Sequence, residues 1–400
     1  MYPFAPRFAV AVAAGPGCVQ ENAFLVYPAL SAAGAKFNGR LQAAFRDTGK
    51  MNRLSKLVLW IAALLVVFSL RPALAQDSVP ETSGFSGYFL AAPAYFKVES
   101  NLIATGAPLL DDVGNDVIQS IFSAPESRSS PALLIGGELD YTFANTRTQV
   151  FFGNRLEDLL RLDLVVGLGV RQELPDKSIL AASVLATPLD LKVWSDPFVE
   201  GQARSRTGLD LPGVRLRWGR ILNTGLELTA TYREFRFDTE TSGDWLIGQG
   251  RLNPADQPLL NRDGTTRRLK ALYRIDVAQK HRFEPAIRYV VDDLDGAAVA
   301  NKGFSLQLTY LYRIPKLILD ANVLYGRREA DALHPVYGQV LESDRYGIAV
   351  SAFIPVKRFK SSVLNLVIGA EAFREDANIA FYDSSIESVS FGILWRHIQK

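Results

Sequence analysis

The sequence predicts an all-β protein, a transmembrane antiparallel β-barrel of about 14 strands with short periplasmic turns and long extracellular loops. Three observations predict this fold. Apolar and polar residues alternate over segments that often reach 10–13 residues, longer than the ~5–6 residues usual for strands of globular proteins. Connections between the segments alternate between short and long. Aromatic residues such as Tyr312 and Trp395 gather at the ends of the apolar stripes, as in the girdles of outer-membrane barrels.

The composition excludes the main alternatives to such a barrel. Of the 400 residues, 48% are hydrophobic and 22% are charged, which is too polar for a bundle of transmembrane helices. A single cysteine, Cys18, excludes a disulfide framework and a cysteine zinc site. We therefore expect no metal and no cofactor.

A complete signal peptide begins at Met51. A short basic stretch that includes Arg53 is followed by an apolar run at 57–70 and by the cleavage motif Ala73-Leu74-Ala75 before Gln76. The alternative is a transmembrane helix, but the run of 14 residues falls short of the ~18–20 that span a bilayer. The signal peptide predicts export to the outer membrane of a Gram-negative bacterium, with cleavage of the signal.

The signal peptide also divides the chain. Residues 51–75 form the signal, and 76–400 form the mature barrel. Because a signal peptide acts at the N-terminus, we expect 1–50 to result from a mis-assigned start and not to belong to the fold.

The alternating segments provide the strands in chain order. In the clearest example, Phe304, Leu306 and Leu308 alternate with Ser305 and Gln307. We expect strands at 85–99, 132–144, 147–153, 160–173, 178–188, 212–221, 225–238, 266–277, 282–292, 303–313, 317–328, 345–356, 363–374 and 386–396. The connection after 147–153 is expected to be a short external loop at 153–159. The longer connections are expected at 102–131, 188–212, 239–264, 293–303 and 328–344, and 188–212 has room for an additional strand pair.

Alternation also predicts which charged residues line the lumen. They are Glu138, Asp140, Arg215, Arg217, Glu227, Arg233, Lys270, Arg274, Glu284, Arg288, Arg313, Asp320, Arg328, Arg345 and Glu371. Charged groups in this position need water or partners, because burying each of them unpaired costs on the order of several kcal/mol. The interior is therefore either a hydrated pore or a lumen closed by salt bridges.

The charge balance of the lumen differs from that of the mature chain. Removing 1–75 takes away eight basic and two acidic residues, which leaves 36 Lys and Arg against 40 Asp and Glu. This acidic balance argues against nucleic acid as a partner. On the predicted lumen face, however, nine basic residues outnumber six acidic ones, which favours a weak preference for anions.

The mature chain offers little for catalysis. Of its three histidines, His281 is expected in a periplasmic turn, His397 lies in the C-terminal tail, and His334 lies in an outer loop. His334 has acidic neighbours, although a solvated loop histidine is the simpler interpretation. The known sequence motifs of hydrolases, zinc proteases and nucleotide-binding loops do not occur in the mature chain. We therefore do not expect an enzyme.

Five ordered motifs identify a resemblance. They are Gly84-Phe85-Ser86-Gly87; Trp194-Ser195-Asp196-Pro197-Phe198 with Gly201 and Arg204; Leu260-Asn261-Arg262-Asp263-Gly264; His334-Pro335-Val336-Tyr337-Gly338 followed by Asp344-Arg345-Tyr346-Gly347; and Asn378-Ile379-Ala380-Phe381-Tyr382-Asp383. In this order they resemble a family of Gram-negative outer-membrane proteins catalogued only as a domain of unknown function. The resemblance covers about 84–396 and implies a barrel without implying an activity.

Two further expectations concern these motifs and the end of the chain. The segment from Trp194 to Arg204 has two interpretations: an interfacial aromatic followed by a strand-ending proline, or a motif that pins a long loop against the lumen wall. Members of the family usually end near an aromatic residue that the barrel-assembly machinery reads, whereas here 396–400 extend beyond Trp395.

The function that the sequence favours is a channel for small hydrophilic solutes. One alternative is a surface enzyme acting on lipid or peptide, motivated by His334 and its acidic neighbours. Another is a non-conducting structural or adhesion barrel in which the loops at 102–131 and 239–264 carry the function. The expected partners are outer-membrane lipid and lipopolysaccharide, and the barrel-assembly machinery during biogenesis.

Overall fold

The computed structural model describes residues 78–104, 113–159, 165–187 and 191–397. They belong to one compact unit of the chain, 70–400. The expected signal peptide and the expected mis-assigned start lie outside the described residues. Within the described part of the chain, no helix is both long enough and apolar enough to cross a membrane.

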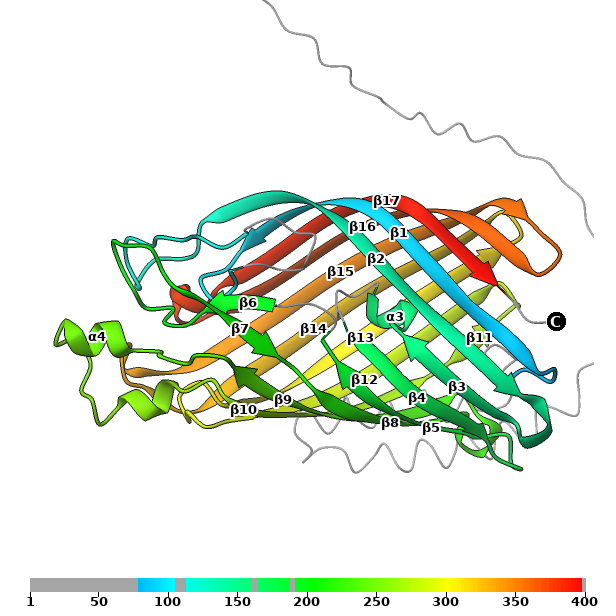
Figure 1. Cartoon of the computed structure of the whole chain (residues 1–400), viewed down its shortest axis with the longest axis horizontal. Coiled ribbons are helices and arrows are strands. Elements are labelled where there is room, and N and C mark those ends of the chain that lie inside the picture. Colours follow the sequence, from blue (N-terminus) through cyan, green and yellow to red (C-terminus); the bar gives the residue numbers. More distant parts are fainter. Residues whose placement is uncertain (1–77, 105–112, 160–164, 188–190, 398–400) are drawn as a thin grey trace, which may run out of the picture. The chain divides into compact units, whose positions relative to one another are not determined.

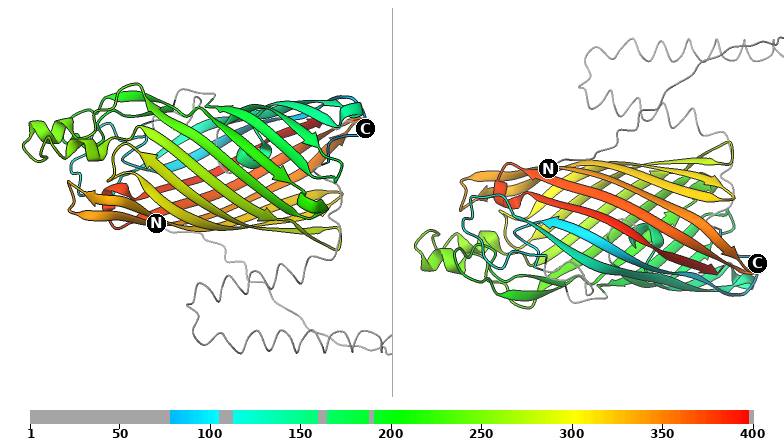
Figure 2. Two further views of the ribbon diagram at one scale, coloured as in Figure 1. Left: turned by 90° about the horizontal axis from the view of Figure 1, so that it is seen from below. Right: turned by 90° about the horizontal axis from the view of Figure 1, so that it is seen from above.

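The wall of the barrel is a closed antiparallel sheet of 14 strands (Figures 1 and 2). In chain order they are β1 (Gly84–Glu99), β2 (Ser127–Phe143), β3 (Thr148–Gly153), β4 (Val166–Glu173), β5 (Ile179–Ala186), β8 (Gly213–Gly219), β9 (Leu226–Phe237), β10 (Gly264–Tyr273) continued by β11 (Ile275–Val277), β12 (His281–Leu294), β13 (Asn301–Ile314), β14 (Leu317–His334), β15 (Gln339–Arg358), β16 (Ser362–Ala377) and β17 (Ser384–His397). The predicted fold class is confirmed.

Pairing between the first and last strands closes the sheet. Leu90 of β1 lies opposite Leu394 of β17, and β1 pairs along its other edge with β2. A closed sheet has no unpaired edge, so the backbone N–H and C=O groups of the wall are satisfied within it. This closure is what allows strands to cross a hydrocarbon layer.

The two faces of the wall differ as the alternation predicts. On β13, Leu308 is 42% exposed, whereas the neighbouring Gln307 and Thr309 are 9% and 2% exposed. Strands throughout the wall likewise carry exposed Leu, Ile, Val and aromatic side chains on the outside. The outer face is therefore an apolar band suited to lipid, and the polar side chains point into the barrel.

This register predicts the effect of an introduced charge. Leu308→Arg places a guanidinium in the apolar band and should lower the free energy of unfolding by about 2 kcal/mol or more. Gln307→Arg points into the polar lumen and should cost much less. Denaturant titration of the refolded barrel in lipid vesicles measures both. Equal losses in the two variants would contradict the register.

The connections are short at the periplasmic end and longer at the outer end, and several bounds differ from the expected ones; the loop expected at 102–131, for example, ends before Ser127, where β2 begins. The segment expected as a loop at 328–344 is mostly strand, because β14 and β15 continue to a turn at 335–338. Cross-strand ion pairs such as Arg327–Glu342 support this extension outside the apolar band. The loop expected at 293–303 shortens to 295–300 for the same reason, since β12 and β13 extend.

An additional strand pair does occur between β5 and β8. It is a hairpin of β6 (Leu191–Trp194) and β7 (Arg206–Asp210). β7 pairs with the outer end of β9, so the hairpin extends the sheet outward and does not add strands to the closed wall.

Candidate functional site: the lumen and its outer cap

The lumen holds two cavities, and the residues predicted to face inward are found in or beside them. An outer cavity of about 390 Å³ is lined by α3 and by strands from β8 to β17, and a periplasmic cavity of about 610 Å³ is lined by strands from most of the wall. Of the fifteen predicted lumen residues, fourteen line one of the two. The fifteenth, Glu227, is 2% exposed and is buried beside the periplasmic cavity, in contact with Arg217 and Arg274.

The outer cavity contains Arg215, Arg233, Lys270, Arg288, Arg328, Arg345 and Glu371 of the predicted set. The periplasmic cavity contains Glu138, Asp140, Arg217, Arg274, Glu284, Arg313 and Asp320. The structure therefore divides the predicted lumen face into a basic outer part and a mixed periplasmic part.

A short helix inside the barrel separates the two cavities. The segment after β3 leaves the wall and forms α3 (Leu156–Leu159), which lies within the barrel (Figure 1). Arg155 and Glu157 line both cavities. This segment was expected to be a short external loop, and that expectation is wrong. The structure instead places a constriction inside the lumen.

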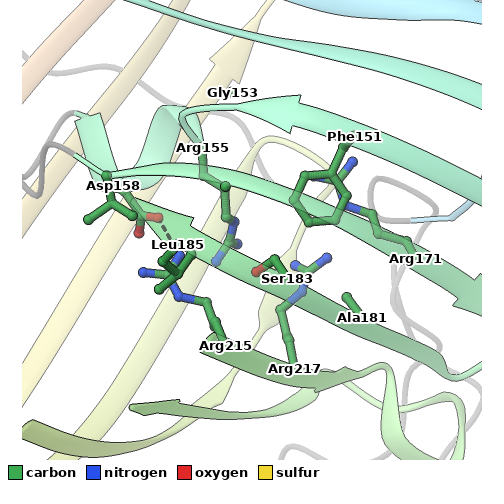
Figure 3. Close-up of a pocket in the computed structure, with 12 residues that line it drawn as sticks. Phe151, Gly153, Arg155, Asp158, Arg171, Ala181, Ser183, Leu185, Arg215 and Arg217 are labelled. Carbon is green, nitrogen blue, oxygen red and sulfur yellow. Dashed lines mark hydrogen bonds and ion pairs between the residues drawn. The ribbon is translucent and has the colours of Figure 1, made fainter. Parts of the chain in front are cut away.

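Ion pairs across the lumen hold α3 in place. Glu157 accepts from Lys270 of β10 at 2.7 Å, and Asp158 accepts from Arg215 of β8 at 2.5 Å. Figure 3 shows the second pair beside Arg155 and Arg217, in a small pocket against the wall. Each acid of α3 is thus joined to a strand that is not its neighbour in sequence.

The short length of β3 is the sequence feature that accords with this inward connection. β3 has six residues, fewer than the ~9–11 that cross a bilayer. The connection after Gly153 therefore starts within the depth of the membrane, where polar side chains such as Glu157 and Asp158 must turn away from lipid.

Further ion pairs join nearby strands along the periplasmic cavity. Arg274 lies 3.0 Å from Glu227 and 3.3 Å from Glu284. Arg171 contacts Glu138 and Asp140 at 2.7 and 2.6 Å. Opposite charges therefore alternate around this cavity, which is lined by seven Arg side chains and five acids, compared with eight basic and three acidic side chains in the outer cavity.

The outer loops pack into a cap with its own hydrophobic core. Its buried members are Ile118, Ile121, Phe198, Leu246, Leu252, Leu260, Ala298, Ile379 and Phe381. Segments that leave nearly opposite sides of the wall meet here, since Ile121 follows β1 and Leu246 lies in α4 (Asp244–Gly248) between β9 and β10. The cap therefore bridges the outer mouth, at the end where the loops gather in Figure 2.

Four of the five motifs that carry the family resemblance contribute to this cap, whereas the first, at 84–87, lies at the periplasmic start of β1. Phe198, Leu260, Ile379 and Phe381 belong to its core, and Tyr337 packs against it. Tyr337 also donates from its hydroxyl to the carbonyl of Ile121 at 2.8 Å, across a separation of 216 residues. The cap residues of these motifs are thus explained by packing between loops.

Trp194 is buried at the base of the cap. It is 0% exposed, and the guanidinium of Arg204 lies 4.3 Å from its ring centre. The expectation of an interfacial aromatic is therefore wrong. Pro197 is part of the same arrangement, because its carbonyl accepts from Arg204 at 3.1 Å. The backbone N–H of Gly201, in a left-handed conformation with φ 69°, donates to Ile118.

Asp196 and Arg204 form hydrogen bonds with backbone N–H and C=O groups of the loops. The Asp196 carboxylate accepts from the N–H groups of Phe198, Gly243 and Trp245 at 2.9–3.2 Å. Arg204 donates to the carbonyls of Asn101, Asn115 and Pro197. These residues join the segment to other loops, whereas the second of the two interpretations of the sequence has it pin a loop to the lumen wall.

His334 lies in the core of the cap and is 0% exposed, so the expectation of a solvated loop histidine is wrong. Its Nδ1 accepts from the backbone N–H of Val336 at 3.2 Å, which places the ring proton on Nε2, 2.8 Å from the hydroxyl of Tyr382. Burial lowers the pKa of His334 to about 4. The imidazole is therefore neutral at physiological pH.

The acidic neighbours of His334 in the sequence, which motivate the enzyme alternative, form ion pairs with other residues. Asp331 pairs with Lys302, and Glu342 pairs with Arg327. His334 is instead surrounded by the rings of Phe198, Tyr337 and Tyr382. Among the described residues, no group of His, Cys, Asp and Glu has a geometry that could hold a metal ion.

The closed wall, the apolar outer band and the charged lumen define an outer-membrane β-barrel protein. The chain belongs to the family described as "Protein of unknown function (DUF2860)", whose model matches residues 84–396. The resemblance inferred from the ordered motifs is therefore confirmed. No curated protein sequence matches the chain.

Solved structures similar to the chain include several outer-membrane proteins. A Pseudomonas aeruginosa FadL homologue is 10% identical, with a TM-score of 0.38, and the match covers 80% of this chain and 90% of that one. A mutant of the TodX monoaromatic hydrocarbon channel is 12% identical, with a TM-score of 0.43 and coverages of 80% and 91%. An anion-selective porin from Comamonas acidovorans is 8% identical, with a TM-score of 0.34 and coverages of 79% and 100%.

Proposed function

We propose that this protein is an outer-membrane channel for small hydrophilic solutes with a weak preference for anions. The observation that carries the proposal is the pair of charged cavities that occupy the lumen on either side of α3. Together they are lined by fourteen Arg and Lys side chains and seven Asp and Glu side chains. Polar walls favour hydrated solutes, and an excess of fixed positive charge raises the local concentration of anions.

The ion pairs of the lumen account for the preference being weak. Many of the basic groups are partly neutralised by acids, as in the contacts of Arg274 with Glu227 and Glu284. The acids of α3 add negative charge where the lumen is divided. Selectivity then depends on the net charge that remains beside this helix.

Planar bilayers test the channel directly. The purified, refolded barrel should insert with stepwise conductance, and a gradient of KCl should give a reversal potential that favours chloride. A barrel that is verifiably folded yet never conducts would overturn the proposal, as would clear cation selectivity.

The Asp158–Arg215 pair offers a matched test of where selectivity is set. Asp158→Asn removes a negative charge from the constriction and should raise the permeability ratio of chloride to potassium about twofold, whereas Arg215→Gln should lower it by a similar factor. Both variants break the same 2.5 Å contact. If the only effect were a loosening of α3, the permeability ratio of chloride to potassium would change in the same direction in both variants. Reversal potentials that shift in the same direction would contradict the assignment.

A further inference from the structure

Two neighbouring turns at the periplasmic end of the wall carry exposed basic residues and no acid. β13 and β14 are joined by the turn at 315–316, and β15 and β16 are joined by the turn at 359–361. The sequence contains no Asp or Glu at 312–319 or at 352–370. We call the four exposed basic side chains of these turns the periplasmic basic patch: Lys316, Lys357, Arg358 and Lys360.

The two turns are joined to each other by a hydrogen bond. Arg358 donates from Nη2 to the carbonyl of Pro315 at 2.7 Å, one residue before Lys316 in the chain. The second turn is closed by the N–H of Phe359, which donates to the carbonyl of Ser362 at 2.7 Å. A guanidinium has five N–H donors, so Arg358 can hold the turns together and still donate to a ligand.

The charges of the patch lack the acidic partners that other exposed lysines have. Lys302 at the outer end of the wall pairs with Asp331 at 3.1 Å, and Lys177 in the periplasmic turn after β4 pairs with Glu173 at 3.1 Å. Within the described part of the chain, no side chain of the patch forms an ion pair. Four like charges without a counter-charge repel one another, which favours an anion from outside the protein.

The register places the patch at the edge of the apolar band. Lys357 lies opposite Leu364, and Leu364 lies opposite Trp395. Trp395 is 42% exposed on the outer face of the wall. Aromatic side chains on the outer face of a barrel lie at the level of the lipid headgroups. Lys357 is therefore at the depth of the headgroup phosphates of the periplasmic leaflet.

Apolar side chains within the same turn favour a lipid over other anions. Val356 and Phe359 are 65% and 50% exposed. The ammonium group of Lys357 lies 5.1 Å from the ring centre of Phe359, so positive charge and apolar surface adjoin. A small hydrophilic anion would leave this apolar surface in water, whereas an acyl chain buries it. The combination fits a ligand with an anionic head and hydrocarbon chains.

We propose that the periplasmic basic patch binds the headgroup of an anionic phospholipid of the phosphatidylglycerol class in the periplasmic leaflet. Lys316, Lys357 and Lys360 supply positive charge around the phosphodiester, and Arg358 donates to its oxygens. Val356 and Phe359 contact the acyl chains. This site is on the outside of the wall and does not depend on whether the lumen conducts.

Native mass spectrometry of the refolded full barrel measures this binding. The barrel in detergent is titrated with phosphatidylglycerol or with phosphatidylcholine of the same acyl chains, and the affinities for the first bound lipid are compared. Phosphatidylglycerol should bind at least about tenfold more tightly, because several basic residues act on one negative headgroup. Equal affinities for the two lipids would overturn the proposal.

Substitutions in the patch locate the site. The double variant Lys357→Gln, Lys360→Gln should weaken phosphatidylglycerol binding about tenfold or more and leave phosphatidylcholine binding unchanged. Lys177→Gln is the matched control, because this periplasmic lysine is equally exposed but compensated by Glu173, and it should stay within about twofold of the wild type. Should the double variant fail to give the folded, heat-modifiable band, Lys360→Gln alone should weaken binding about fivefold. Equal losses in the patch variant and in Lys177→Gln would overturn the location.

Two competitors separate the lipid from other anionic partners. Glycerol phosphate carries the anionic group without acyl chains, and it should not displace phosphatidylglycerol at the same concentration. Displacement would overturn the lipid assignment in favour of a free phosphate compound. Purified peptidoglycan should not bind through the patch. Binding to peptidoglycan that is lost in the double variant, in a barrel without preference for phosphatidylglycerol, would overturn the proposal in favour of the cell wall.

Discussion

Arg204→Ala should unfold the base of the outer cap while leaving the barrel wall intact. Arg204 is 4% exposed and donates to the backbone carbonyls of Asn101 and Asn115, between β1 and β2, and of Pro197 in its own connection. Its loss leaves these buried acceptors without a donor and removes the cation from the face of Trp194. Removing a buried, multiply bonded charged group of this kind costs about 3–5 kcal/mol.

Arg206→Ala is the matched control for this variant. Arg206 also lies over Trp194, at 5.6 Å from the ring centre, and pairs with Asp116 at 2.9 Å, but it is exposed. Breaking an exposed ion pair costs about 1 kcal/mol or less. Limited proteolysis of intact vesicles should therefore cut the loops of Arg204→Ala much faster than those of Arg206→Ala. Equal cleavage rates would contradict the structural role of Arg204.

Acidification should weaken the cap through His334. Burial lowers its pKa to about 4, whereas a histidine in an unfolded chain titrates near 6.5. Between these two values the unfolded segment binds the proton and the folded one does not, so stability is complete above about pH 6.5 and is lost as the pH falls toward 4. The difference corresponds to about 3 kcal/mol at pH 4.

The arrangement around the ring explains why the proton is excluded. Nδ1 already accepts from the N–H of Val336, and the ring is enclosed by Phe198, Tyr337 and Tyr382. Hydrogen exchange of the turn at 335–338 should accelerate between pH 6.5 and 4 after correction for the intrinsic rate. His334→Phe should abolish this dependence, although it is less stable at neutral pH because the contact with Tyr382 is lost. The same acid response in that variant would assign the effect to other groups.

Much of the candidate site follows from alternation along single strands. Because side chains point to opposite faces in turn, a segment such as 303–313 predicts by itself that Leu308 faces lipid and Gln307 faces the lumen. The fifteen charged residues predicted for the lumen were identified in this way, residue by residue. Alternation does not predict their grouping into a basic outer cavity and a mixed periplasmic cavity, because this grouping depends on how far each strand is shifted against its partner.

The parts that were missed depend on contacts between distant segments. The inward fold of α3 requires Lys270 and Arg215 to meet Glu157 and Asp158, although the short length of β3 was visible in the sequence. The extension of β14 and β15 was missed because charged residues such as Arg327 interrupt the apolar alternation. Outside the lipid band, ion pairs between the two strands replace that alternation as the source of stability.

The sequence by itself determined that this protein is an outer-membrane barrel of 14 strands, which face of each strand meets lipid, and which ordered motifs relate it to its family. Only the tertiary structure decided that four of those motifs contribute to one cap over the mouth and that α3 divides the lumen. The physical reason is the distance along the chain between the residues that interact. Alternation is imposed by lipid on one side and water on the other, residue by residue, whereas the cap and the constriction arise where the closed sheet brings together residues far apart in the chain.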